Sequence, residues 1–240
     1  MAKLKVPSLQ HMARNWGETP EFVQKQLVNL ALNPPIFNYR ALFGAARDLL
    51  LFKQPLSEVE AGIRKGTANT KVRENFLEVL PLLHGHFDQI QPQIVQAVST
   101  RFYPVARGLL IPFDQPIIYA IGGQLYFPWL SFWRSNPLSG EKLQLFVSIV
   151  REILQQDPDL EAARFEILDF SASPGEGRRL TVIDTADIPD LSNERKKEML
   201  DIFAQGFFQA SAELAQRREA PSESEEDASA DSRQFSLFDN

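Results

Sequence analysis

The amino-acid sequence predicts an α+β protein with three parts. These are a helical N-terminal half, a mixed or antiparallel sheet in the order βββαββα, and a disordered acidic tail. Apolar residues recur at helical spacing through residues 1–98, which form the helical region. In residues 99–218 aromatic and β-branched residues gather in short runs between Pro and Gly, which is typical of strands. Residues 219–233 have almost no apolar side chains, so we expect a disordered linker that leads to a short binding motif at 234–240.

Composition limits the class of protein. The 240 residues are 44% hydrophobic, which is enough to bury a substantial core. The absence of Cys excludes disulfides, thiolate metal sites and cysteine nucleophiles. The chain begins without the long apolar core of a signal peptide, and no apolar run approaches about 18 residues. We therefore expect a soluble, cytoplasmic protein that does not enter a membrane.

Local signals place the helices of the N-terminal half. Thr19 followed by Pro20 begins a helix, because Pro at the first helical position loses no hydrogen bond. Ser57 and Glu60 have the spacing of a capping box for a short helix. The expected helices run from Thr19 to about Asn33, from about Asn38 to Lys53, from Ser57 to near Gly66 and from near Thr70 onward, with a further turn or two over 92–98.

The sheet region begins near Arg101. Gly122-Gly123 between two apolar runs predicts a tight hairpin. The run 124–133 is apolar on both faces, so its strand should be central in the sheet. The expected elements are strands over 102–113, 116–121 and 124–133, a helix over 140–156, strands over 164–171 and 178–185, and a last helix from Ser192.

The densest aromatic stretch, residues 126–134, includes Trp129, Phe132 and Trp133. Aromatic rings of this kind could stack on nucleic-acid bases, but base-stacking sites are normally interleaved with Lys and Arg. Here only Arg134 is basic, so the stretch favours a core or a subunit interface, and a homodimer contact is one possibility.

Candidates for chemistry are few. His84-Gly85-His86 with Asp88 is the one cluster that resembles metal ligands, but it reads as a helix end without a second ligand set. The segment 173–177 reads as a turn between strands, and the two arginines that follow it should face solvent. We therefore name no catalytic residue, no metal site and no cofactor.

Charge is distributed unevenly. Seven of the 31 acidic residues and one of the 25 basic residues lie from Glu219 onward, so the tail carries a net charge of −6. The remaining 24 acids and 24 bases cancel. An acidic linker repels itself and stays extended, which keeps its tip available to a partner.

At that tip lies the string Gln234-Phe235-Ser236-Leu237-Phe238. It resembles the short motif by which bacterial replication and repair proteins dock on the sliding clamp, in the form Gln, variable, Ser or Asp, Leu, Phe. The resemblance implies that Gln234 is hydrogen-bonded at the edge of a clamp pocket. It also implies that Leu237 and Phe238 fill that pocket, with Ser236 at the third position.

The element order from about Thr70 to Ser171 is similar to the core of restriction-endonuclease-like nucleases. That resemblance implies an acid on the second strand and an acid-x-Lys triplet on the third, which together hold Mg²⁺. The sequence has neither, and Asp114 alone precedes the second strand. If the fold is of this kind, its catalytic site has been lost.

These observations favour a non-catalytic accessory protein of DNA replication or repair that is recruited to the sliding clamp and reaches DNA only indirectly. One alternative is a nuclease-like enzyme or a degenerate nuclease fold. Another is a protein-binding inhibitor or subunit that uses residues 126–134.

Overall fold

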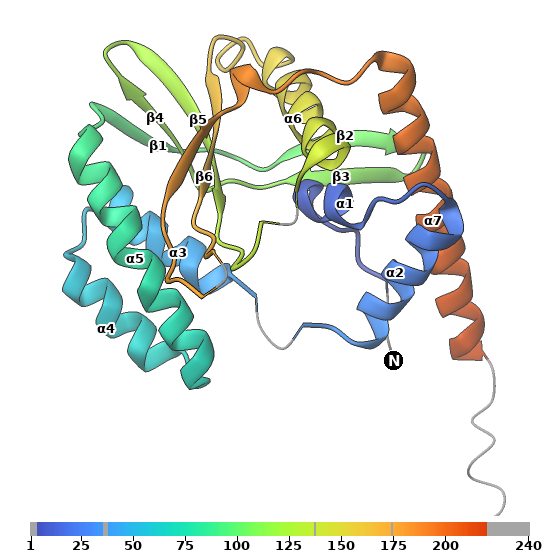
Figure 1. Cartoon of the computed structure of the whole chain (residues 1–240), viewed down its shortest axis with the longest axis horizontal. Helices are drawn as coiled ribbons and strands as arrows, with labels where there is room; N and C mark the ends of the chain where they lie inside the picture. Colours follow the sequence, from blue (N-terminus) through green and yellow to red (C-terminus); the bar gives the residue numbers. More distant parts are fainter. Residues whose placement is uncertain (1–3, 36–37, 137, 174, 220–240) are drawn as a thin grey trace, which may run out of the picture.

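The computed structural model of the protein describes residues 4–35, 38–136, 138–173 and 175–219 (Figure 1). A mixed five-stranded sheet forms the centre of the protein. The strand order is β1-β4-β5-β6-β7, and all neighbours are antiparallel except β5 and β6, which are parallel. The bounds are β1 Ile94–Ala97, β4 Ile117–Ile121, β5 Gln124–Ser131, β6 Arg164–Asp169 and β7 Thr181–Asp184.

Helices cover both faces of this sheet (Figure 1). One face is covered by α3 (Arg40–Leu50) and α5 (Thr70–Ile90), and α4 (Leu56–Gly66) packs against these two helices. The other face packs against α6 (Gly140–Gln155), which is joined by α1 (Leu9–Asn15), α2 (Pro20–Leu32) and α7 (Asn193–Glu219). The chain therefore contains two helical layers with the sheet between them.

Strand β5 shows why the sheet is buried on both sides. Trp129 belongs to the core beneath α6, while its neighbour Leu130 belongs to the core beneath α3 and α5. Successive side chains of a strand point to opposite faces, so an uninterrupted apolar run fits a strand with a core on each side. The prediction that this strand is central is confirmed, because β5 is the third of five strands.

The predicted α+β class, with helices in the N-terminal half and a mixed sheet, is confirmed. Helix α2 begins as expected, and the backbone N–H of Phe22 donates to Thr19 Oγ1 at 3.2 Å. Gly122 and Gly123 form the tight turn between β4 and β5 with φ of 56° and 82°, a conformation that favours glycine.

Two strand predictions differ from the structure. Residues 92–98, expected to be helical, contain β1, which pairs with β4. Residues 102–113, expected to be one strand, form a separate hairpin of β2 (Arg101–Ala106) and β3 (Leu109–Phe113). Strand β1 also joins the predicted regions 1–98 and 99–218 in one sheet.

Two details of the N-terminal helices also differ. Helix α4 begins at Leu56 without a side-chain cap, so Ser57 and Glu60 form no capping box. His84 and His86 lie inside α5 rather than at its end, since the helix continues to Ile90.

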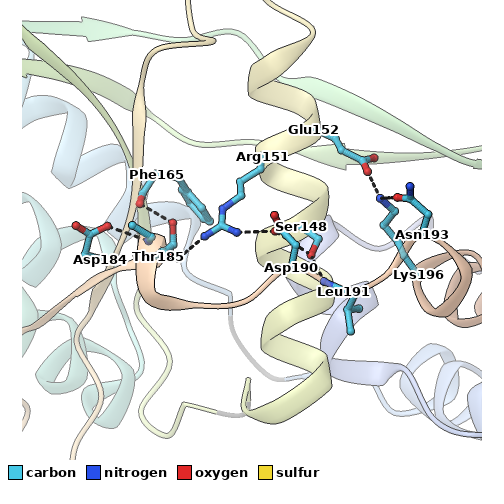
Figure 2. A network of polar contacts seen from close by, with 11 residues as sticks. Ser148, Arg151, Glu152, Phe165, Asp184, Thr185, Asp190, Leu191, Asn193 and Lys196 are labelled. Atoms are coloured by element: carbon cyan, nitrogen blue, oxygen red, sulfur yellow. Dashed lines mark hydrogen bonds and ion pairs between the residues drawn. The ribbon is translucent and has the colours of Figure 1, made fainter.

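A set of polar contacts, which we call the α6 joint, fixes α6 to the chain that connects β7 with α7 (Figure 2). It comprises Ser148, Arg151, Glu152, Thr185, Asp190 and Lys196. Arg151 of α6 donates to the Asp190 carboxylate and to the backbone carbonyl of Thr185, and Lys196 of α7 pairs with Glu152. Each cation of the joint therefore has a carboxylate partner, and the role of this network is structural.

Helices α2 and α7 approach each other closely at Gly206. A Cβ atom added there would lie 2.6 Å from the Pro20 carbonyl oxygen and 2.6 Å from the Val23 Cβ. The absence of a side chain at Gly206 thus sets how closely the two helices pack.

Candidate functional site

The residues predicted to bind the clamp, Gln234, Ser236, Leu237 and Phe238, lie outside the described residues, which end at Glu219. Among the residues of α7 whose burial is described, which end at 217, Leu214 is the last buried one, and residues 215–217 are exposed.

The predicted interface residues Trp129, Phe132 and Trp133 are 1%, 2% and 8% exposed. They belong to the cores at the end of β5 and line one wall of a cavity. A partner could reach them only through that cavity. An interface built on residues 126–134, including a homodimer, stays a prediction that light scattering can test.

The arginine cavity, as we call it, is an open space of about 780 Å³ at one end of the sheet. Its lining includes Arg14, Arg40, Arg47, Asp114, Ser131 and Trp133. The chain enters β4 and leaves β5 at this end, and α1 from one helical layer and α3 from the other form the flanking walls. The cavity thus lies where the two layers separate beyond the edge of the strands.

Three arginines surround the arginine cavity. Arg40 and Arg47 lie seven residues apart on α3, with Gly44 between them on the same face, and Arg14 is on α1. No carboxylate of the described residues lies within ion-pairing distance of these guanidinium groups, although arginines form ten ion pairs elsewhere among the described residues. Asp114 is the one acid in the lining, so the wall carries a formal charge of +2.

Trp133 anchors the α1 side of the arginine cavity. The Arg14 guanidinium carbon lies 5.5 Å from the centroid of the Trp133 ring, close enough for a cation–π contact. The His11 ring packs edge-on against the same indole at 5.3 Å, and its Nδ1 shares a 2.7 Å hydrogen bond with Ser8 Oγ. Burial, with a smaller contribution from nearby Arg14, lowers the pKa of His11 to about 4, so this imidazole is neutral at pH 7.

The buried end of the arginine cavity is polar. Gln115 is nearly inaccessible, and its amide accepts from the Leu130 backbone N–H at 3.1 Å and donates to the Asp114 carbonyl at 2.7 Å. Ser131 and Gln10 are 1% and 9% exposed, and Ser131 Oγ and Gln10 Oε1 have no hydrogen-bond partner among the described residues. Because a buried polar group without a partner costs about 1–3 kcal/mol, these two atoms are available to hydrogen-bond with water or with a polar ligand.

Two arginines outside the arginine cavity, Arg178 and Arg195, are bonded to other parts of the fold. Arg178, expected to face solvent, is buried and donates to Asn75 Oδ1 and to the backbone carbonyls of Phe170 and Trp133. Arg195 of α7 donates to the Glu141 carboxylate of α6 at 2.7 and 2.9 Å and so holds the two helices together.

A smaller cavity of about 230 Å³ lies beside the α6 joint. Its two arginines, Arg151 and Arg164, are paired with Asp190 and Asp184, so neither offers a charge to a ligand. This cavity is therefore a weaker candidate than the arginine cavity.

Metal ions in proteins are most often held by His, Cys, Asp and Glu side chains. Within the described part of the chain, no three of these residues are grouped so that they could hold a metal ion. His84 Nδ1 instead lies 3.1 Å from Asp88 Oδ2, one helical turn away. On β6, burial raises the pKa of Glu166, whose carboxylate accepts a hydrogen bond from Tyr119.

The aromatic wall of the arginine cavity includes Trp129, Phe132 and Trp133, which the sequence predicted as core or interface, whereas its arginines were not predicted. The spacing of Arg40, Gly44 and Arg47 on an expected helix is a usable signal, because residues seven apart share a helix face. The position of Arg14 in the sequence does not indicate that it shares a cavity with Arg40 and Arg47. It lies on α1, and only the tertiary fold brings α1 and α3 to the same cavity.

None of the helices formed by the described residues combines the length and apolar content needed to span a membrane. No protein-family model matches the sequence, and no curated protein matches it.

Proposed function

We propose that this chain is a non-catalytic accessory protein of DNA replication or repair that docks on the bacterial sliding clamp in the cytoplasm. Gln234, Ser236, Leu237 and Phe238 make the contact. The observation that carries the proposal is the string Gln-Phe-Ser-Leu-Phe, placed within the last seven residues and after a strongly acidic segment.

The end of the folded body supports this arrangement. Gln234 follows Glu219 by 15 positions, and a linker of that length would span about 20 Å if it is the flexible coil that its composition predicts. A motif on such a linker can occupy a clamp pocket while the body stays close to the clamp and to the DNA that it encircles. Docking then raises the local concentration of the body without requiring DNA affinity from it.

The strength of docking follows from the two apolar side chains. Burying Leu237 and Phe238 contributes roughly 1.5–3 kcal/mol each. After the cost of ordering the linker, we expect a Kd of about 1 μM, which corresponds to roughly −8 kcal/mol.

The test is a binding titration of the full chain against an immobilised bacterial sliding clamp. Phe238→Ala should weaken binding by about tenfold or more, because it empties the pocket. Phe235→Ala is the matched control: it removes the same side chain at the tolerant second position and should change affinity little. Deleting residues 234–240 should abolish binding and leave the melting temperature unchanged, and undiminished affinity of that truncated chain would refute the proposal.

A second candidate is a degenerate nuclease-like fold, and the order of elements supports it. Helix α5 is followed by β1, by the separate β2–β3 hairpin, and by β4 and β5, then by α6 and by β6 parallel to β5. The end of β5 carries Trp129, Leu130 and Ser131 where the resemblance implies an acid-x-Lys triplet. Incubation with single- and double-stranded DNA should give no cleavage with or without Mg²⁺; Mg²⁺-dependent cleavage would restore the enzyme alternative.

A further inference from the structure

The arginine cavity has the features of a built ligand site. Its volume of about 780 Å³ falls within the roughly 300–1,000 Å³ typical of small-molecule sites. It combines unpaired cations at the mouth, an aromatic wall and unpartnered polar atoms at the buried end. Nothing in the proposed clamp docking uses any of these features.

The charge identifies one part of the ligand. Arginine presents a planar fork of donors that matches the oxygens of phosphate and carboxylate. The net +2 of the wall is balanced by one terminal phosphate, which carries about −1.5 to −2 at pH 7, and is only half balanced by a carboxylate or a phosphodiester. His11 adds no charge at pH 7, because its imidazole is neutral. The complement of this wall is therefore a phosphate monoester.

The aromatic wall and the unpartnered polar atoms of the arginine cavity indicate what the phosphate is attached to. Aromatic side chains including Phe43, Phe132 and Trp133 line the arginine cavity, and such a wall accommodates a planar, weakly polar ring. Gln10 Oε1 needs a hydrogen-bond donor, while Ser131 Oγ can donate or accept. A nucleoside supplies a planar base with both donors and acceptors at its edge, which a simple sugar phosphate does not.

We propose that the arginine cavity binds a nucleoside monophosphate, either free or as the phosphorylated end of a single nucleic-acid strand. The phosphate contacts Arg40 and Arg47 at the mouth, and the base lies toward the aromatic wall. The inference rests on the cavity alone. All variants used to test it keep residues 220–240 unchanged, so its outcome is separate from that of clamp docking.

The first test measures the role of the phosphate on the full chain. A 3′-fluorescent oligothymidine is titrated with the protein at low salt, once with a 5′-phosphate and once with a 5′-hydroxyl. We expect the phosphorylated strand to bind at least about tenfold more tightly. Unlabelled dTMP should displace it, and thymidine should not. Equal affinity for the two strands would overturn the proposal, as would no binding by the strand and dTMP at about 1 mM.

Substitutions then locate the site. Arg40→Gln and Arg47→Gln should each weaken binding of the phosphorylated strand by about tenfold. Arg107→Gln is the matched control, because Arg107 lies exposed in the β2–β3 turn without an ion pair and loses the same charge. An equal loss with Arg107→Gln would mean non-specific attraction and would refute the site.

A blocking variant separates binding from folding. Gly44 lines the arginine cavity on α3, and a Cβ added there meets nothing within 4 Å. Gly44→Leu keeps every charge, extends a side chain into the cavity and favours the helix more than Gly does. We expect binding to fall by at least about tenfold while the melting temperature does not fall. Unchanged binding by this variant would overturn the proposal.

The same titrations distinguish the two sources of the ligand. If dTMP alone binds as tightly as the strand, the ligand is a free nucleotide. If the strand binds more than about tenfold more tightly, neighbouring nucleotides add contacts and the ligand is a strand end. Both results support a nucleoside monophosphate site.

Discussion

The α6 joint and the arginine cavity use the same side chain in opposite ways. In the joint Arg151 bonds to Asp190 and to a backbone carbonyl, and Lys196 bonds to Glu152 (Figure 2). In the cavity Arg14, Arg40 and Arg47 have no carboxylate partner among the described residues. Since the two regions lie in one fold, the difference separates arginines that hold helices together from arginines that are available to a ligand.

Pairing determines what each region can tolerate. A paired cation contributes to stability, and its loss leaves a carboxylate without its partner. An unpaired cation contributes little to stability, and a further positive charge beside it is unfavourable. The following experiments test this contrast, from the largest expected effect to the smallest.

Acidification should place a charge on the buried His11 imidazole, which lies beside Arg14. The pKa of His11 is lowered to about 4 by burial and by Arg14, so the folded state binds this proton less readily than the unfolded state does. The contribution of His11 to stability is therefore lost as the pH falls from about 6.5 toward 4, by up to about 3 kcal/mol.

The matching experiment is urea unfolding of the wild type and His11→Gln at several pH values. Because the variant cannot take up this proton, its stability relative to the wild type should rise as the pH falls from 7 to 4. A stability difference between the two proteins that stays constant from pH 7 to pH 4 would show that protonated His11 is tolerated beside Arg14. That result would contradict the contrast drawn between the arginine cavity and the α6 joint.

Two glycines in helix interiors should respond oppositely to the same substitution. Gly206→Ala places a methyl group 2.6 Å from the Pro20 carbonyl oxygen, so α2 and α7 must move apart at a cost of about 1–3 kcal/mol. Gly44→Ala meets nothing within 4 Å and should stabilise α3 by about 0.5–1 kcal/mol.

Thermal unfolding of both alanine variants checks this pair. Destabilisation by Gly44→Ala would mean that the wall of the arginine cavity is as closely packed as the α2–α7 contact. The arginine cavity would then not offer the open space beside Gly44 that the proposed ligand site requires.

The sequence was most informative where a local signal controls the structure. Thr19 with Pro20 predicted the start of α2, and Gly122-Gly123 predicted the β4–β5 turn, because caps and tight turns depend on a few adjacent residues. Apolar content on both faces of 124–133 predicted a central strand.

The predictions from sequence were wrong or incomplete where tertiary contacts determine the structure. The Arg107-Gly108 turn between β2 and β3 lies within an apolar run, and its Gly108, at φ 81°, was not recognised as a break. Residues 94–97 become a strand because they pair with β4, whose partner residues lie 20 to 26 positions away in the chain. The arginine cavity was missed for the same reason, since Arg14 and Arg47 are brought together only by helices of different layers.

The smallest expected effect gives the most direct test of the comparison. Arg151→Gln removes the bonds to Asp190 and Thr185 and should cost about 1–2 kcal/mol, because hydrogen bonds between charged groups contribute more than neutral ones. Arg47→Gln makes the same chemical change at an exposed, unpaired position and should alter stability by less than about 0.5 kcal/mol. Chemical denaturation of the two variants under one set of conditions measures the difference. Equal losses would mean that Arg47 also stabilises the fold, and its availability to a phosphate would then have to be argued from binding alone.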